Sequence, residues 1–290
     1  MYNDEGEGVM DQTQVLAYKA YTDKMTLLNY SGNTIKNYKN HFSKFLEYFK
    51  DKKPSEITKK EILEYLLAKW SNNKLSESEQ NQKINSIKFF YEKVLNRPCE
   101  VYEIPRPKKP FKLPEVFSEN EVRRILDAAG NLKHKCILCL AYAGGLRVSE
   151  IINLKIADID SDRMVIHIKN SKGKKDRIVM LSKKLLIILR EYYKSYKPES
   201  YLFEGMNGGK YSARSIQALL KNIKSKAGVK KRGSVHTLRH SFATHLFEGG
   251  TDILSIKKLL GHNSLRTTMI YTHVSKEYIN KIQSPLDKLL

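Results

Sequence analysis

The sequence predicts a mainly α-helical protein with one small antiparallel β-sheet, an α+β fold arranged as two domains. Apolar residues recur every three or four positions over most of the chain, which is the period of amphipathic helices. Only residues 158–181 change to an alternating pattern, in which two apolar runs flank a polar turn, and this predicts a hairpin. Five of the eight prolines lie between Pro98 and Pro114, where they exclude a regular helix or an interior strand. We therefore expect a helical domain, a linker and a mixed domain.

The first domain, expected over residues 1–104, has the pattern of four helices. A helix over residues 12–29 is followed by one whose apolar face repeats at spacings of three and four: Ile35, Tyr38, Phe42, Phe45, Leu46 and Phe49. Capping boxes, in which glutamate follows a hydroxyl residue by three positions, predict where the last two helices begin: Thr58 with Glu61, and Ser76 with Glu79.

The linker, expected over residues 105–114, is basic as well as rich in proline. It carries Arg106, Lys108, Lys109 and Lys112. Two interpretations remain open at this point. The segment is either a connection that is basic only because the whole chain is basic, or an extended strap that follows a phosphate backbone.

The second domain is expected over residues 115–290. Ser118 and Glu121 predict a helix that ends at Gly130, and an apolar segment at Cys136–Tyr142 predicts the next one. Three short strands follow, at Ile156–Ile159, residues 164–168 and residues 177–181, with a turn at residues 170–175. From Ser182 onward the pattern is helical again, with breaks near Tyr201–Lys210 and Gly228–Gly233.

Composition favours a polyanionic partner. The 52 Lys+Arg against 31 Asp+Glu give a formal net charge of +21, which is typical of nucleic-acid binding and less often of binding to anionic membranes. The apolar run Leu185–Leu189 is far too short to span a bilayer. The acidic N-terminus at Met1–Met10 does not resemble a signal peptide, so we expect a cytoplasmic protein. Cys136 and Cys139 are expected to pack as small apolar groups rather than bind zinc.

Groups suited to phosphodiester chemistry gather in the last quarter of the chain. On a helix that begins near Ser234, His236 and His240 share one face and Arg239 borders it. His262 directly follows Gly261, which is expected to end a helix, and Tyr271 lies on the next helix. A solvated face would carry lysine and glutamate instead, and Arg239 would repel a zinc ion. We therefore expect no metal at these histidines.

The motifs, taken in order, resemble the tyrosine recombinases of the phage integrase type, and most of all the Xer branch. They are G-G-L-R-V-S-E with Arg147, S-K-G-K-K-D-R with Lys172, H-T-L-R-H-S-F-A-T-H-L, L-L-G-H, and I-Y-T-H-V with Tyr271. The resemblance covers the second domain from about Ser118. It implies that this is a catalytic domain and that the first domain is a DNA-binding core-binding domain.

The resemblance also implies roles for individual residues. Tyr271 would attack a DNA phosphate to form a 3′-phosphotyrosyl link, and Arg147 and Arg239 would bind the phosphate oxygens. Lys172 would protonate the leaving 5′-oxygen, His236 would accept the proton of Tyr271 or orient it, and His262 would donate to a non-bridging oxygen. Glu150 and His240 would orient the residues of this cluster without contacting the phosphate. The reaction needs no cofactor, metal or ATP, because the covalent link conserves the energy of the cut bond.

The implied partners are double-stranded DNA and further copies of the chain, as dimers to tetramers on DNA, with a second recombinase or accessory protein left open. Residues Ser275–Leu290 are expected to dock on a neighbouring protomer. Two alternatives remain: a type IB topoisomerase and a DNA-binding protein without catalysis. The sequence also leaves open the DNA target and the choice between a housekeeping Xer role and that of a mobile-element integrase, an integron-like enzyme or an invertase.

Overall fold

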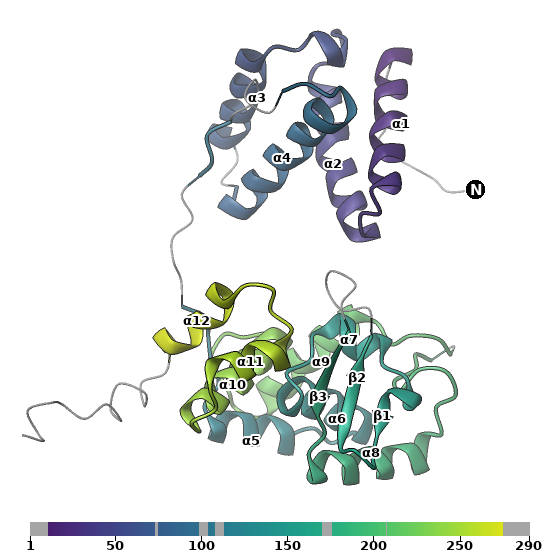
Figure 1. Ribbon diagram of the computed structural model, residues 1–290, viewed down its shortest axis with the longest axis vertical. Helices are drawn as coiled ribbons and strands as arrows, with labels where there is room; N and C mark the ends of the chain where they lie inside the picture. The colour runs from purple at the N-terminus through teal and green to yellow at the C-terminus, as the bar shows by residue number, and fades with distance from the viewer. Residues whose placement is uncertain are drawn as a thin grey trace, which may run out of the picture. The chain divides into compact units, whose positions relative to one another are not determined.

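The computed structural model describes residues 11–72, 75–98, 104–107, 113–169, 176–206 and 208–274. The chain forms two compact units, Met1–Phe111 (the N-terminal unit) and Lys112–Leu290 (the C-terminal unit), and we describe each by itself. Helices predominate in both, and the described residues contain one three-stranded antiparallel sheet (Figure 1), so the predicted fold class is confirmed. The proposed domain limits at residues 104, 105, 114 and 115 stay predictions.

The N-terminal unit has four α-helices in its described residues: α1 at Gln12–Leu27, α2 at Gly32–Tyr48, α3 at Lys59–Asn72 and α4 at Glu77–Phe89. A π-helical turn at Phe90–Val94 continues α4. The capping box before α3 is confirmed, because the backbone N–H of Thr58 donates to Glu61 Oε2 at 2.8 Å and the N–H of Glu61 donates to Thr58 Oγ1 at 3.3 Å.

Aromatic side chains fill the core of this unit. Phe42, Phe45 and Leu46 on α2 are fully buried, as their spacing predicts. Phe42 stacks on Tyr21 of α1 with ring centroids 4.2 Å apart. The Tyr21 hydroxyl lies 2.9 Å from Ser86 Oγ on α4, which satisfies the polar end of the buried phenol. Three helices are therefore joined through one stack.

The C-terminal unit is built mainly from helices. Their bounds are α5 Glu119–Asp127, α6 Leu132–Ala143, α7 Val148–Asn153, α8 Lys183–Tyr196, α9 Ala213–Lys226, α10 Val235–Glu248, α11 Ile253–Leu260 and α12 Leu265–Val274. Helix α6 packs against both α8 and α10. Its Cys136 and Cys139 are buried with free thiols, so their predicted packing is confirmed, while Cys99 lies outside the described residues.

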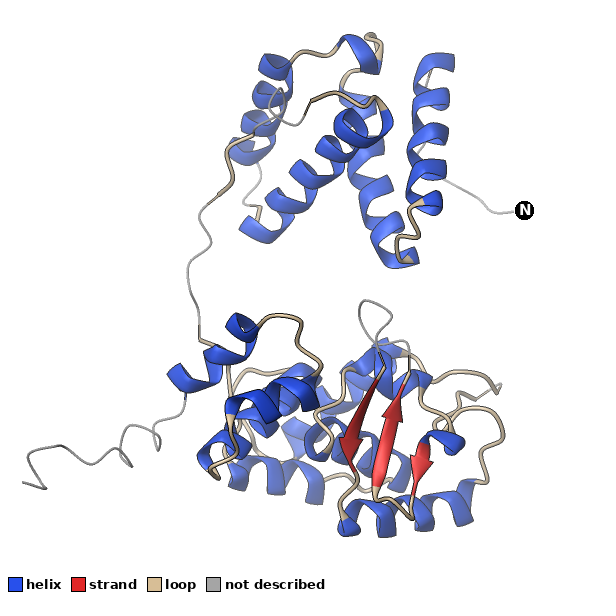
Figure 2. Ribbon diagram, in the orientation of Figure 1, coloured by secondary structure: helices blue, strands red, loops and turns tan. Residues whose placement is uncertain are grey.

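The sheet consists of β1 at Ile159–Asp160, β2 at Val165–Ile168 and β3 at Arg177–Met180, in the order β1-β2-β3 with antiparallel pairs (Figure 2). Ile166 pairs with Val179, and both side chains are buried. The hairpin prediction is therefore confirmed. Residues Ile156–Asp158 differ from the prediction, because they form a 3-10 turn before the first strand. The turn at 170–175 lies outside the described residues.

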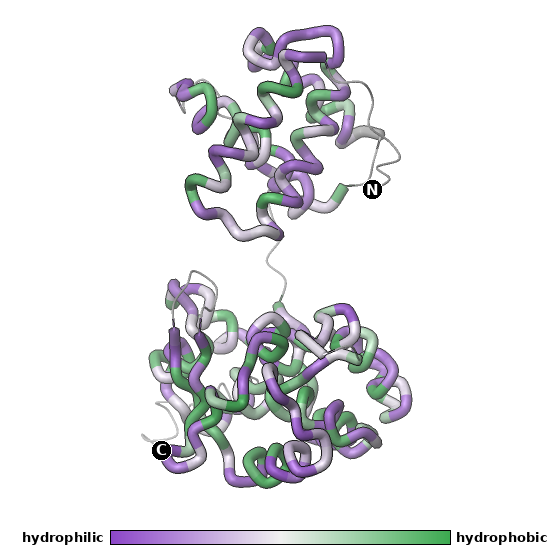
Figure 3. The backbone as a smooth tube through the Cα atoms, turned by 90° about the vertical axis from the view of Figure 1, so that its right-hand side faces the viewer, coloured by the Kyte–Doolittle hydropathy of each residue, from purple (hydrophilic) through white to green (hydrophobic). Residues whose placement is uncertain are grey.

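Hydrophobic and hydrophilic residues alternate along the helices of both units (Figure 3), as expected for helices that bury one face. Within the described residues, none of the helices has the length and the apolar character required to span a membrane.

Candidate active site

Four separate segments of the C-terminal unit bring the predicted site residues together. Arg147 precedes α7, and α10 carries His236, Arg239 and His240. His262 follows α11, and Tyr271 lies on α12. Helix α10 contacts both α11 and α12, which brings the residues on α10 close to His262 and Tyr271. Lys172, the predicted general acid, lies outside the described residues.

Arg239 is the buried centre of this arrangement. Its side chain is fully buried, and its two Nη atoms donate to main-chain carbonyls, Nη1 to Gly145 and Nη2 to Leu260, each at 2.5 Å. A carboxylate oxygen of Glu150 lies 3.8 Å from Nη1. The sequence led us to expect an arginine open to a phosphate. Here the guanidinium group of Arg239 instead joins the segment before Arg147 to the segment before His262.

Gly145 is the residue that permits this contact. Its φ of +57° lies in the left-handed region that side chains avoid. A Cβ added there would lie 2.5 Å from Cδ1 of Phe242, on the same helix as Arg239. The second glycine of G-G-L-R is thus required because the turn passes close to α10 and presents its carbonyl to Arg239.

Glu150 holds three arginines around one carboxylate. Its Oε2 accepts from the backbone N–H of Arg147 at 2.8 Å, and its Oε1 accepts from Arg147 Nη1 at 2.8 Å. Arg177 donates Nη1 to Oε1 at 2.6 Å and Nη2 to Oε2 at 2.8 Å. Burial alone would raise the pKa of Glu150, but the hydrogen bonds and charges of Arg177 and Arg147 outweigh it and lower that pKa to about 2.

Arg177 is a site residue that the sequence reasoning missed. Besides its two bonds to Glu150, its Nε donates to the carbonyl of Leu259 at 2.8 Å, one residue before the carbonyl that Arg239 contacts. A signal for it was present. Arg177 shares a strand face with the buried Val179, where alternation predicts an apolar residue. An arginine at such a position needs a buried partner, and Glu150 is that partner.

Tyr271 is buried, with 1% of its surface exposed, and its ring packs among Phe242, Ile256 and Leu260. Its hydroxyl lies 3.1 Å from Nδ1 of His240. The prediction assigned the orienting of this phenol to His236, and the structure places His240 there instead. The ring of His236 packs edge-on against His240 with centroids 4.5 Å apart.

His262 is positioned by the end of α11 and by α12. Gly261 takes the left-handed conformation with φ of +62°, as expected for a helix stop, and the N–H of His262 donates to Lys257. Nδ1 of His262 lies 3.0 Å from Oγ1 of Thr268, which is fully buried. Thr268 therefore fixes the imidazole, and the other ring nitrogen, Nε2, stays available for a ligand.

The protonation states follow from burial beside the arginines. Burial and then neighbouring positive charge lower the pKa of His236, that of His240 to about 4 and that of His262 to about 3. Burial raises the pKa of Tyr271 to about 12, although Arg239 and Arg147 act in the opposite direction. Burial lowers the pKa of Arg239 to about 9. At neutral pH the site therefore contains neutral imidazoles, a protonated phenol and charged arginines.

The described residues hold no group of three or more histidine, cysteine, aspartate or glutamate side chains arranged to bind a metal ion. In the His236–His240 pair, whose spacing resembles a zinc motif, His240 contacts the Tyr271 hydroxyl and His236 packs against the ring of His240.

Residues 115–278 match the phage integrase family, and residues 18–100 match the phage integrase N-terminal SAM-like domain. The chain belongs to the phage integrase family. It is 39% identical to a putative integrase/recombinase of Sinorhizobium fredii, over 92% of this chain and 87% of the relative. It is 38% identical to the tyrosine recombinase XerA of Pyrococcus horikoshii, over 87% and 86% of the two chains. The Xer-like resemblance of the motifs is therefore confirmed.

A solved structure supports the fold of this integrase-family protein. The XerH site-specific recombinase, crystallised with its palindromic difH substrate as a post-cleavage complex, superposes with a TM-score of 0.74. The match covers 95% of this chain and 97% of that one at 22% identity. At this identity the comparison concerns the fold, which in both proteins includes the two units.

Proposed function

We propose that this integrase-family protein is a site-specific DNA recombinase that cuts and rejoins strands through a 3′-phosphotyrosyl intermediate. One observation carries the proposal: the hydroxyl of Tyr271 lies against an imidazole, in a site charged by Arg147 and Arg239. The net charge of +21 supports DNA as the substrate. The relative that was solved with its DNA substrate after cleavage supports the same substrate class.

In the first step, the oxygen of Tyr271 attacks the phosphorus and the bond from phosphorus to the 5′-oxygen breaks. The phenol proton passes to Nδ1 of His240, which lies 3.1 Å away and is neutral because burial lowers its pKa. The phosphotyrosyl bond retains the energy of the cut phosphodiester. The 5′-hydroxyl of a second strand then attacks the phosphorus and releases the tyrosine, so no ATP is consumed.

The arginines and His262 stabilise the charge that develops on the phosphate oxygens. Arg147, with 20% of its side chain exposed, is the arginine that meets the phosphate directly. Arg239, whose side chain is buried, contributes through its positive charge. We assign His262 the tautomer in which Nδ1 accepts from Oγ1 of Thr268, 3.0 Å away, so that Nε2 carries the proton and donates to a non-bridging oxygen. We assign the protonation of the leaving 5′-oxygen to Lys172.

The burial of Tyr271 has a consequence for this mechanism. With 1% of the residue exposed, its hydroxyl is not accessible to a DNA phosphate. We therefore infer that, on DNA, α12 shifts enough for the hydroxyl to reach the phosphorus while it stays within reach of Nδ1 of His240. Assembly as dimers and tetramers would couple the two cleavages, and residues Ser275–Leu290 would dock on a neighbouring protomer. Residues 1–104 would form the core-binding domain, joined by the linker at 105–114 to the catalytic domain at 115–290.

A suicide duplex tests the proposal. Its recognition sequence is obtained by selection from random duplexes, and a nick lets the 5′ fragment diffuse away so that the covalent adduct accumulates. The wild-type protein and Tyr193→Phe, which removes an exposed phenol on α8, should both form the adduct. Tyr271→Phe should form none while it still binds the duplex.

Three outcomes would contradict the proposal. An adduct of unchanged yield with Tyr271→Phe would exclude the assigned nucleophile. Relaxation of supercoiled plasmid that lacks the selected sequence would favour a type IB topoisomerase. Absence of any adduct with the wild-type protein on its selected site would favour a binding protein without catalysis.

A further inference from the structure

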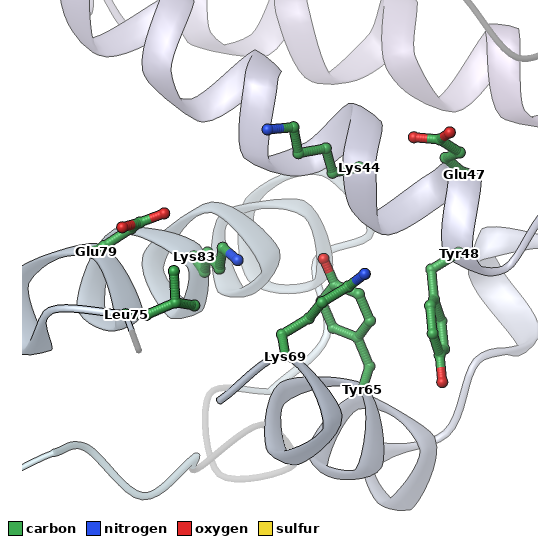
Figure 4. Close-up of a pocket in the computed structure, with 8 residues that line it drawn as sticks. All are labelled: Lys44, Glu47, Tyr48, Tyr65, Lys69, Leu75, Glu79 and Lys83. Atoms are coloured by element: carbon green, nitrogen blue, oxygen red, sulfur yellow. The ribbon is translucent and has the colours of Figure 1, made fainter. Parts of the chain in front are cut away.

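The N-terminal unit contains a second cluster of cations, outside the site described above. A pocket of about 510 Å³ opens between α2, α3 and α4 (Figure 4). One lysine from each helix lines it: Lys44 from α2, Lys69 from α3 and Lys83 from α4. Tyr65 contributes to the same wall, and Figure 4 shows its hydroxyl and the amino groups of Lys69 and Lys83 facing the pocket.

Lys83 is the unusual member of this cluster. Only 8% of the residue is exposed, yet no ion pair or hydrogen bond joins its ammonium group to any described residue. Its Nζ is not among the buried atoms of the described residues that lack a partner, so the aliphatic stem of Lys83 is buried while the ammonium group opens into the pocket (Figure 4). Burial lowers the pKa of Lys83, Glu79 opposes this effect, and Lys44 and Lys69 reinforce it.

Tyr65 provides a second donor without an acceptor. The residue is 1% exposed, and its hydroxyl has no hydrogen-bond partner among the described residues. Burial raises the pKa of this phenol to about 12, so it keeps its proton at neutral pH. The Tyr65 hydroxyl faces the pocket (Figure 4), whereas Tyr91 of the same unit donates its hydroxyl to the carbonyl of Pro54 at 2.9 Å.

Lys69 is held at the wall of the pocket by aromatic rings. Its Nζ lies 5.5 Å from the ring centroid of Tyr48 and 5.9 Å from that of Tyr65. These contacts place the ammonium group without consuming its hydrogen-bond donors. The pocket therefore combines three ammonium groups and one hydroxyl with two carboxylates, those of Glu47 and Glu79, so the cations outnumber the anions in its lining (Figure 4).

We propose that this pocket binds a phosphate group, with Lys83 and Tyr65 donating from within and Lys69 and Lys44 from the walls. A phosphate offers several acceptor oxygens and at least one full negative charge, which matches a donor set of this kind. The phosphate belongs either to the backbone of a bound DNA duplex or to a free phosphate compound. This inference goes beyond the proposed recombinase activity, and its first test requires no DNA.

The chain carries its own reporter for this test. Its one tryptophan, Trp70, lies on α3 beside Lys69, so tryptophan fluorescence follows the unfolding of the N-terminal unit within the full-length protein. Thermal unfolding is measured in sodium phosphate and in sodium chloride at equal ionic strength. Phosphate should raise the midpoint of the wild-type protein by about 4 °C or more, because a ligand that binds only the folded state stabilises it.

The variants separate a specific site from a general salt effect. Lys83→Met should remove the response to phosphate, and Lys44→Met should reduce it while leaving the core intact. Lys36→Met removes the same charge from the exposed face of α2 and should respond like the wild type. An equal phosphate response in all four proteins, or none in the wild type, would overturn the proposal, because phosphate also stabilises proteins non-specifically.

A second measurement identifies the source of the phosphate. If a DNA phosphate occupies the pocket, Lys83→Met should make the slope of log binding constant against log salt shallower by about 0.9 than Lys36→Met does. A free compound is the ligand if the two slopes agree while the phosphate response of the wild type persists. Neither outcome depends on strand cleavage, so the phosphate result can still be interpreted if the recombinase proposal fails.

Discussion

Each unit contains a cationic residue that is buried among its described residues, and the charged ends of these two residues are placed in opposite ways. Arg239 in the C-terminal unit is fully buried and donates to the carbonyls of Gly145 and Leu260. Lys83 in the N-terminal unit is 8% exposed and has no partner among the described residues. The difference indicates that a cation bonded to the protein's own carbonyls acts as a scaffold, whereas one whose ammonium group opens into a pocket is available to a ligand.

The largest expected effect tests this contrast directly. Arg239→Met should destabilise the C-terminal unit by roughly 3 kcal/mol, because it leaves two buried carbonyls and the carboxylate of Glu150 without their partner. Lys83→Met should change the stability of the N-terminal unit by less than about 1 kcal/mol, since no bond in the described residues is lost. Urea unfolding followed by circular dichroism and by Trp70 fluorescence measures both. An equal cost for the two variants would refute the contrast.

Arg177→Lys tests whether the hydrogen bonds of Arg177 to Glu150 and Leu259 align the site. Lysine keeps the charge but cannot donate to both oxygens of Glu150 and to the carbonyl of Leu259 at once. We expect adduct formation on the suicide duplex to slow by about tenfold, with little change in the affinity for the duplex, because Arg147 and His262 lose their alignment. The matched control is Arg163→Lys in the turn before β2. Equal rates for the two variants would limit Arg177 to a packing role.

The histidines of the C-terminal unit predict a dependence of stability on pH. The folded-state pKa values of His240 and His262, about 4 and about 3, lie below the ordinary histidine pKa of 6.5. The unfolded chain therefore binds more protons, and the free energy of unfolding should fall as pH decreases from about 6.5 toward 4. His262→Asn should make this decline less steep, whereas His167→Asn on β2 should not. Parallel profiles for all three proteins would argue against neutral, buried imidazoles.

Glu150 acts in a lower pH range. Its pKa of about 2 lies below the ordinary glutamate pKa of 4.5, so its stabilising contribution is complete above pH 4.5 and disappears as the pH falls toward 2. Glu150→Gln should flatten the stability profile in that window only. A wild-type profile that is already flat between pH 4.5 and 2 would contradict the network of three arginines.

The smallest effect concerns the partner of His262. Thr268→Val removes the hydroxyl that fixes Nδ1 and should slow adduct formation a few-fold, whereas Thr268→Ser should retain the wild-type rate. Equal rates in the two variants, with unchanged stability, would show that the orientation of this imidazole does not depend on the hydroxyl.

Local sequence patterns determined much of this protein. The capping boxes at Thr58–Glu61 and Ser118–Glu121 fixed where α3 and α5 begin, and alternation fixed the hairpin. The same patterns placed Gly261 at the end of α11. Each of these depends on interactions within a few residues, such as a side chain that satisfies a free backbone N–H of the first helical turn. A short window of sequence contains all the partners.

The tertiary structure alone decided which groups meet. His240 rather than His236 contacts Tyr271, 31 positions away, and Arg177 reaches Leu259 across 82 positions. Arg239 turns to the carbonyl of Gly145, 94 positions before it. The periodicity of a helix shows which residues share a face, but not which distant element covers that face. That choice depends on the packing of whole cores, and for this reason the engaged Arg239 and the unpaired Lys83 look alike in the sequence.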